Sequence, residues 1–405
     1  MFSGWFRTKE GTSLGDRFRS KAEARMTKRA TWIGLAVTIS LGFSAFAAAQ
    51  TTKTVTFNTR DKGVPRVIKE WGIDATWVNY YNAKASLKNA GDQIGFIRIG
   101  FYLHEQTNED GSLSDGQIEK LDGALRFVDM VDEEMPVMLS PCNMAGIIDW
   151  YKNSDGTAKV DRWFNVMLRS KQYVESKGHK VVSVEVFNEP DFRKWNMGKA
   201  ADLNHLLRMC ATPEVKRIGP STLATQPASD WYQVIRANVE VGSTHTLGGN
   251  MMQYVEFINL VKRHLKQFMN PEVHALVEAI VGAELGIDSV CWWDQINKGR
   301  AAFMKANRGK RLAFVPVIEN WSAACVYRSP DEGLYGFAST NERTNGKDTV
   351  YHFVCLDNDV TYCLNGNAKK GVSVKKGQPF KVQAKVEGQG KESITKWFTI
   401  IPSDK

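Results

Sequence analysis

Residues 181–191 read Val-Val-Ser-Val-Glu-Val-Phe-Asn-Glu-Pro-Asp. The first seven are mostly apolar, which is typical of a strand buried on both faces in a parallel sheet. The run stops at Asn188, Glu189, Pro190 and Asp191, which are polar or turn-forming. A carboxylate beside an amide at the end of a buried strand is poorly suited to core packing and well suited to a cleft. This placement indicates catalysis.

The segment from Val64 to Val317 alternates strand-like apolar runs with helical patterns, which predicts βαβ units and a parallel sheet. Eight strands are expected, at residues 69–74, 94–100, 136–140, 181–187, 215–219, 239–244, 265–269 and 287–292. Eight strand–helix units in roughly 260 residues fit a (β/α)8 barrel. A doubly wound open sheet is the alternative, but no Gly-x-Gly-x-x-Gly turn follows the first strand.

The character of the chain changes after about residue 311, where helical periodicity disappears and Gly, Asn, Asp and Lys punctuate short strands. From Phe380 to Val386 apolar and polar residues alternate, as in an antiparallel strand with one exposed face. We therefore expect an α/β catalytic barrel over residues 50–310 and a small accessory β-sandwich over residues 311–405.

Residues 1–49 are expected to be an N-terminal extension and signal peptide. An apolar core at 32–43 follows two basic residues at 28–29 and precedes small residues that suit cleavage. The core is too short to span a bilayer, which needs about 20 apolar residues. We expect a secreted or periplasmic protein with no membrane association after cleavage. Met26 begins a more ordinary signal peptide than Met1 does.

The charge of the chain is mildly basic once this extension is set aside. Residues 1–49 hold eight Lys or Arg and three Asp or Glu, so the exported part carries +4 of the formal net charge of +9. The basic residues are scattered, which argues against nucleic-acid binding. Attraction to an anionic glycan, such as a sulfated one, stays open.

The six cysteines occur in no CxxC or other metal-ligand spacing, so neither a metal nor an organic cofactor is expected. Export would permit disulfides. Cys355 and Cys363 are the best pair, because a separation of eight residues suits a hairpin. The alternative, buried free thiols, stays open for Cys142, Cys210 and Cys291.

The strand that ends in Asn-Glu-Pro resembles the fourth barrel strand of the clan A retaining glycoside hydrolases, which are (β/α)8 barrels. The resemblance covers residues 65 to about 310. It implies that Glu189 is the general acid/base and that Asn188 holds the sugar 2-hydroxyl. It also implies that Arg98, near the end of the second strand, supports the nucleophile, and that His245, at the end of the sixth, lies in the site. For both, an ordinary structural ion pair or hydrogen bond is the alternative.

The same resemblance places a second carboxylate at the end of the seventh strand. Glu272 lies there and is our choice of nucleophile, which retaining hydrolysis requires at about 5 to 5.5 Å from the acid. The seventh strand is poorly apolar and Pro271 precedes Glu272, which departs from the clan pattern. Glu278, Glu284 and Glu319 are therefore kept as alternatives.

Aromatic residues supply the remaining candidates. In the clan, a Trp that ends the eighth strand forms the platform for the reacting sugar, and this chain has Trp292 and Trp293 there. Trp77 and Trp195 lie in expected loops and are further candidates for substrate contact. Packing is the alternative for each of these rings.

These patterns predict a monomeric retaining glycoside hydrolase of a polysaccharide or oligosaccharide, similar to secreted bacterial members of the clan, with agarase-like or porphyranase-like enzymes as one analogy. The alternative function is a non-catalytic glycan-binding protein on a degenerate barrel, against which the two carboxylates at strand ends argue. A metal-dependent hydrolase would need a His and Asp cluster, of which only His245 and Asp74 are evident.

Overall fold

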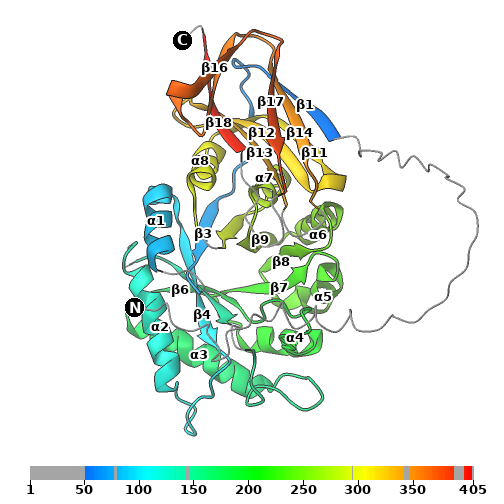
Figure 1. Ribbon diagram of the computed structural model, residues 1–405. Helices are drawn as coiled ribbons and strands as arrows, with labels where there is room; N and C mark the ends of the chain where they lie inside the picture. The colour runs from blue at the N-terminus through cyan, green and yellow to red at the C-terminus, as the bar shows by residue number, and fades with distance from the viewer. Residues whose placement is uncertain are drawn as a thin grey trace, which may run out of the picture. The chain divides into compact units, whose positions relative to one another are not determined.

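Eight parallel strands close into a barrel (Figure 1). The ring closes because β10 pairs in parallel with both β3 and β9. All eight expected strands are present, so the prediction of an eight-stranded parallel barrel is confirmed. The strands are β3 (Glu70–Asp74), β4 (Phe96–Tyr102), β5 (Val137–Cys142), β6 (Val181–Glu185), β7 (Lys216–Ala224), β8 (Val241–Gly248), β9 (Gln267–Val273) and β10 (Ser289–Trp292).

The computed structural model describes residues 51–76, 80–132, 134–142, 146–293, 295–341, 346–386 and 396–403. The expected signal peptide and the candidate Trp77 lie outside the described residues. None of the described helices is long and apolar enough to cross a membrane.

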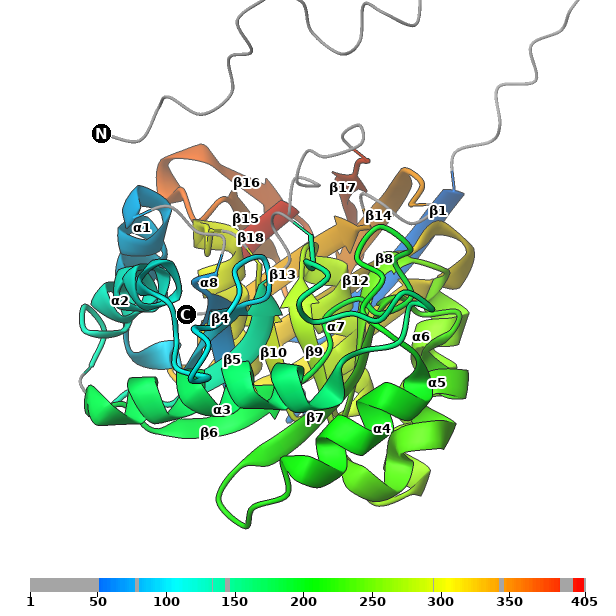
Figure 2. The same ribbon diagram turned by 90° about the horizontal axis from the view of Figure 1, so that it is seen from below.

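An α-helix follows each barrel strand and covers the outside of the barrel (Figure 2). These helices are α1 (Tyr80–Ala90), α2 (Asp115–Val128), α3 (Val160–Ser176), α4 (Ala200–Met209), α5 (Ala228–Ile235), α6 (Met251–Arg263), α7 (Leu276–Leu285) and α8 (Lys298–Asn307). Short 3-10 turns lie at η2 (Gly91–Gln93), η3 (Arg236–Asn238), η4 (Ile318–Asn320) and η5 (Ala368–Lys370). Capping boxes start α2, at Ser114 and Gln117, and α6, at Asn250 and Gln253.

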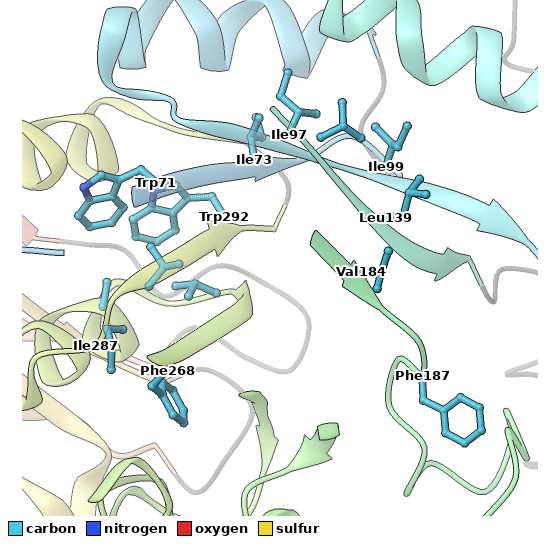
Figure 3. Close-up of a cluster of buried hydrophobic side chains, with 14 of the residues drawn as sticks. Trp71, Ile73, Ile97, Ile99, Leu139, Val184, Phe187, Phe268, Ile287 and Trp292 are labelled. Atoms are coloured by element: carbon cyan, nitrogen blue, oxygen red, sulfur yellow. The ribbon is translucent and has the colours of Figure 1, made fainter. Parts of the chain in front are cut away.

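Side chains along β4 alternate between the interior of the barrel and the layer between strands and helices. Ile97 and Ile99 join the large hydrophobic cluster that the strands share with the helices (Figure 3). Phe96 belongs instead to a small cluster with residues of five other barrel strands, which can meet only inside the barrel. Arg98 shares that inward face. A charged side chain is thus directed into the barrel interior, where it requires buried partners.

Two additional sheets are built mainly from the C-terminal part of the chain. The three-stranded sheet contains β1 (Thr51–Phe57), β14 (Thr349–Cys355) and β17 (Pro379–Ala384). The seven-stranded sheet contains β2 (Val64–Pro65), β11 (Lys310–Val317), β12 (Ser322–Arg328), β13 (Leu334–Thr340), β15 (Val360–Leu364), β16 (Gly371–Val374) and β18 (Lys396–Pro402). Apolar residues of both sheets form one buried cluster.

The N-terminal strands β1 and β2 belong to these additional sheets, although we assigned the whole range 50–310 to the barrel. β1 pairs in parallel with β14, and its Val55 and Phe57 are buried in the cluster between the sheets. The pairing joins segments about 300 residues apart, so no local pattern around residue 51 could indicate it.

Helix α7 is buried on every side. It packs between the barrel and the strands β12 and β13, and the Val277 amide donates to Ser339 Oγ at 3.1 Å. A helix covered on both faces has no need of a polar stripe. The preceding strand β9 ends at Val273, and the helix begins at Leu276.

The expected disulfide between Cys355 and Cys363 is absent. All six cysteines, each within the described residues, are buried free thiols. Cys355 ends β14 and Cys363 lies on β15, and these strands belong to different sheets rather than to one hairpin. The short separation in sequence was therefore misleading.

Close packing of β8 on α6 gives a stability test at Gly242. A Cβ atom at Gly242 would lie 2.4 Å from Val261 Cγ2, whereas one at Gly95 would meet nothing nearer than 3.8 Å. We expect Gly242→Ala to lower the free energy of unfolding by about 1–3 kcal/mol, measured by urea denaturation, and Gly95→Ala to change it much less. The double variant with Val261→Ala should lose less than the sum of the single variants. Strict additivity would contradict this account of the packing.

Candidate active site

Arg98 lies at the centre of a buried polar cluster inside the barrel. Its guanidinium donates to Asp74 at 2.5 Å, to Glu185 at 2.8 Å and to Glu272 at 3.1 Å. It also donates to Asn188 Oδ1 at 2.7 Å and to Ser140 Oγ at 2.9 Å. These partners come from β3, β5, β6, β9 and the loop after β6, so one side chain joins most of the ring.

Glu272 lies on β9 with both carboxylate oxygens held. Arg98 donates to Oε2, and His274 Nε2 lies 3.1 Å from Oε1. The His274 ring is itself stacked on Trp293, with ring centroids 4.5 Å apart. Burial alone would raise the pKa of Glu272, but the positive charges of His245 and Arg98 and the hydrogen bond from His274 hold it well below its ordinary value.

The register of β9 explains how Glu272 faces inward although Pro271 precedes it. Val290 of β10 pairs with Asn270, and Trp292, two residues later, pairs with Val273, three residues later. β9 therefore carries a bulge, which is where a strand tolerates proline. The extra residue shifts the alternation of side chains, so that Glu272 rather than Pro271 is directed at Arg98.

Glu189 lies just after β6, in a backbone conformation with φ of 57°. Its amide donates to the Ser221 carbonyl at 2.9 Å, and the Asp191 carboxylate accepts from the Leu223 and Ala224 amides at 2.6 and 3.0 Å. These bonds fasten the loop to β7. Trp195 Nε1 donates to Glu189 Oε2 at 2.7 Å, which fixes the carboxylate. A left-handed conformation at a non-glycine residue is strained and is common at functional sites.

His245, on β8, lies fully buried among three carboxylates. Its Nδ1 is 3.4 Å from Glu189 and 3.8 Å from Glu272, and its Nε2 is 3.9 Å from Glu185. Burial would lower the pKa of His245, but these three carboxylates together raise it to about 10. The imidazole is therefore a cation at neutral pH. The pKa of Glu185 is lowered to about 2, because Arg98 and His245 outweigh its burial.

Glu189 and Glu272 meet across this cation. One carboxylate oxygen of each and one nitrogen of His245 all lie within 4.8 Å of one another. Three such atoms could in principle share a metal ion. Arg98 already donates to Glu272, so this carboxylate has a positive partner within the protein. The arrangement is that of two facing carboxylates with positive side chains around them.

Three residues of the cluster were missed by the sequence interpretation: Ser140, Glu185 and His274. Glu185 carried a signal, because it is a carboxylate inside a mostly apolar strand and had to be paired if buried. Ser140 is an ordinary strand residue, and nothing local indicates its role. His274 follows Glu272 by two residues, and only the end of β9 brings the two side chains together.

The three alternative carboxylates lie outside the cluster around Arg98. Glu278 is buried and accepts from the Ala275 amide at 3.1 Å, the His274 amide at 3.3 Å and Asn341 at 3.0 Å, so it caps α7. Glu284, in the last turn of α7, pairs with Arg311 at 2.9 Å. Glu319 is exposed on η4.

The candidate tryptophans differ in where their rings lie. Trp292 was expected as a sugar platform, but it is 0% exposed and stacks on Trp71 in the hydrophobic core, with ring centroids 5.7 Å apart (Figure 3). A ring with no exposed face cannot stack on a substrate, so that prediction is wrong. Trp293, partly exposed beside His274, and Trp195, beside Glu189, lie next to the two carboxylates.

A separate cavity of about 370 Å³ opens at the N-terminal ends of the barrel strands, where Lys69, Gly95 and Gln267 line it. Active sites of such barrels are built at the opposite, C-terminal ends. The cluster around Arg98 is therefore the candidate active site, and this cavity is not.

Comparisons with known proteins identify the fold. No protein-family model and no curated protein sequence matches the chain. Among solved structures, a glycoside hydrolase family 30 endoxylanase from Clostridium papyrosolvens C71 matches with a TM-score of 0.53 and 13% identity, over 87% of this chain and 100% of that chain. A family 30 subfamily 8 xylanase from Clostridium acetobutylicum gives 0.51 and 12%, over 86% and 99%. SrfJ from Salmonella typhimurium gives 0.52 and 11%, over 86% and 93%.

These matches extend beyond the barrel segment, because they span more of the chain than residues 50–310 do. At such identities they show a shared fold. The expected likeness to clan A glycoside hydrolases is confirmed at that level.

The charge on His245 gives a test by pH. Its pKa in the folded protein is about 10, against 6.5 ordinarily, so its contribution to stability is complete below pH 6.5 and is lost as pH rises toward 10. We expect the free energy of unfolding to fall over this range by up to about 1.4 kcal/mol per pH unit. His245→Gln should remove that component, measured by urea denaturation at pH 6, 7, 8 and 9.

His352→Gln, on β14, is the matched control and should keep the wild-type slope. Equal slopes in wild type and His245→Gln would show that His245 is not held as a cation.

Proposed function

We propose that this protein is a retaining glycoside hydrolase that cleaves a polysaccharide or oligosaccharide by double displacement. One observation carries the proposal, namely that carboxylate oxygens of Glu189 and Glu272 lie within 4.8 Å of each other. Retaining enzymes hold their two carboxyl groups about 5 to 5.5 Å apart, whereas inverting enzymes leave about 6.5 to 9.5 Å for a water molecule. A degenerate, binding-only barrel would have no reason to keep this pair together.

In the first step Glu272 attacks the anomeric carbon while Glu189 gives its proton to the leaving oxygen. The C–O bond to the leaving group breaks, and a glycosyl ester with Glu272 forms. Arg98 and His274 hold one oxygen each of Glu272, so the nucleophile is ionised and oriented before substrate arrives. In the second step Glu189, now a carboxylate, takes a proton from water, which displaces Glu272 and restores both groups.

His245 and Asn188 are assigned supporting roles. The cationic imidazole lies against both carboxylates and compensates their charge in a buried site. Asn188, held by Arg98, is placed to hydrogen-bond the sugar 2-hydroxyl, as the clan resemblance implies. Trp293 and Trp195 are proposed to pack against the sugar ring.

We further propose that the protein acts outside the cytoplasm as a monomer, with no membrane association after signal cleavage. The two additional sheets are proposed to form one accessory β-sandwich, since their facing apolar residues share a cluster. The substrate should be sought with a panel of plant and algal polysaccharides. Xylan belongs first in it, because two of the matched structures are xylanases.

Glu189→Gln should fold normally and lose about 10²- to 10⁴-fold in activity on the natural polysaccharide, since an amide cannot donate the proton. An activated aryl glycoside, whose leaving group needs no proton, should be cleaved in its first step with a much smaller loss. Steady-state and burst kinetics on both substrates measure the difference. Equal losses on the two would remove Glu189 from the acid role.

Glu272→Gly should abolish turnover, and azide or formate should restore part of it on an aryl glycoside by filling the vacated space. The product formed with the external anion should have inverted configuration, because the anion attacks from the face of Glu272. Glu319→Gly is the matched control and should keep wild-type activity. Near-normal activity of Glu272→Gly would assign the nucleophile to another residue.

A further inference from the structure

A second groove lies on the side of the protein, between barrel helices and the seven-stranded sheet, with a volume of about 410 Å³. It shares no residue with the cluster around Arg98. We call it the helix–sheet groove, and its principal lining residues are Asn89, Gln93, Lys298, Tyr335, Asn365 and Trp397.

Two partly buried aromatic rings line this groove, Trp397 on β18 and Tyr335 on β13. The Trp397 ring lies directly against the turn at Gly366, where an added Cβ atom would come within 2.8 Å of it. The backbone of the turn therefore supports the ring and fixes its orientation. A fixed, partly exposed indole loses little conformational entropy when a flat ligand packs against it.

The polar part of the groove combines Lys298, Lys305 and Thr399 with side-chain amides that the backbone holds. Asn89 Nδ2 donates to the Ile296 carbonyl at 2.9 Å, and Gln93 Nε2 donates to the Ala90 carbonyl at 2.8 Å. Each bond uses an amide nitrogen and leaves the carbonyl oxygen as an acceptor. Gln93 Oε1 is buried and has no partner among the described residues. A buried acceptor without a donor is unfavourable, because it has given up its hydrogen bonds to water.

We propose that the helix–sheet groove is a second glycan-binding site that holds a polysaccharide chain outside the active site. A pyranose ring offers apolar C–H faces, which suit Trp397 and Tyr335, and a rim of hydroxyl donors, which suit the amide oxygens. The groove would keep the polymer near the enzyme while the active site works on another part of it, which raises the effective concentration of bonds to cleave.

The test is retardation of the protein in native gels, each containing arabinoxylan, mixed-linkage β-glucan, xyloglucan or carrageenan. The Glu272→Gln background prevents digestion during the run. We expect at least one polysaccharide to retard this protein, and the double change Trp397→Ala and Tyr335→Ala to weaken that affinity by about tenfold or more. Tyr173→Ala, a partly exposed tyrosine on α3, is the matched control and should leave it unchanged.

The proposal would be overturned if none of the four gels retarded the protein, or if retardation were equal with and without the two groove rings. It would also be overturned if Tyr173→Ala lost as much affinity for the polysaccharide as the double variant does. Trp397→Leu and Tyr335→Leu keep the apolar volume and serve if the alanine variants fail to fold. Cleavage by the wild-type protein is scored separately. A protein that is retained through the groove but cleaves nothing would therefore contradict the proposed hydrolase function and leave the groove standing.

Discussion

The bonds that Arg98 makes to Asp74, Glu185 and Glu272 are the interaction on which the candidate site depends. Four carboxylates converge on the interior of this barrel, and burying them without compensation would cost several kcal/mol each. Arg98 and the protonated His245 provide the compensation. The pKa of Arg98 shows the balance: burial would lower it, but Glu185, Asp74 and Glu272 raise it well above its ordinary value.

This compensation also determines the chemistry that the site can perform. Glu272 is bonded to a guanidinium, lies near an imidazolium and keeps a pKa far below neutrality, which suits a nucleophile. Among the hydrogen bonds described, none joins Arg98 to Glu189. The Glu189 carboxylate instead accepts a hydrogen bond from Trp195 and faces His245. Two carboxylates with such different neighbours can take different roles in one reaction.

Much of this arrangement could be predicted from the sequence, for physical reasons. Most of the buried parallel strands are continuous apolar runs, so the barrel was recognisable although its seventh strand is poorly apolar. Glu189 was conspicuous because it follows such a run. Glu185 was missed because its partners, Arg98 and His245, are distant in the chain. His274 was missed because only the fold of β9 brings its ring against Glu272, two residues earlier. Trp292 was misplaced because a sequence does not show which of two adjacent rings faces the core. β1 was assigned to the barrel because its partner, β14, lies about 300 residues away.

The most direct test of the account is the configuration of the first-formed sugar product, followed by ¹H NMR of the anomeric proton on whichever polysaccharide of the panel is cleaved. The account predicts that the product first appears with the anomeric configuration of the bond that was cleaved, and changes only later by mutarotation. Glu272 displaces the leaving group at the anomeric carbon, and water then displaces Glu272. Each displacement inverts the configuration of this carbon, so the two together retain it. Initial release of the opposite anomer would contradict the pairing of Glu189 with Glu272 as acid/base and nucleophile.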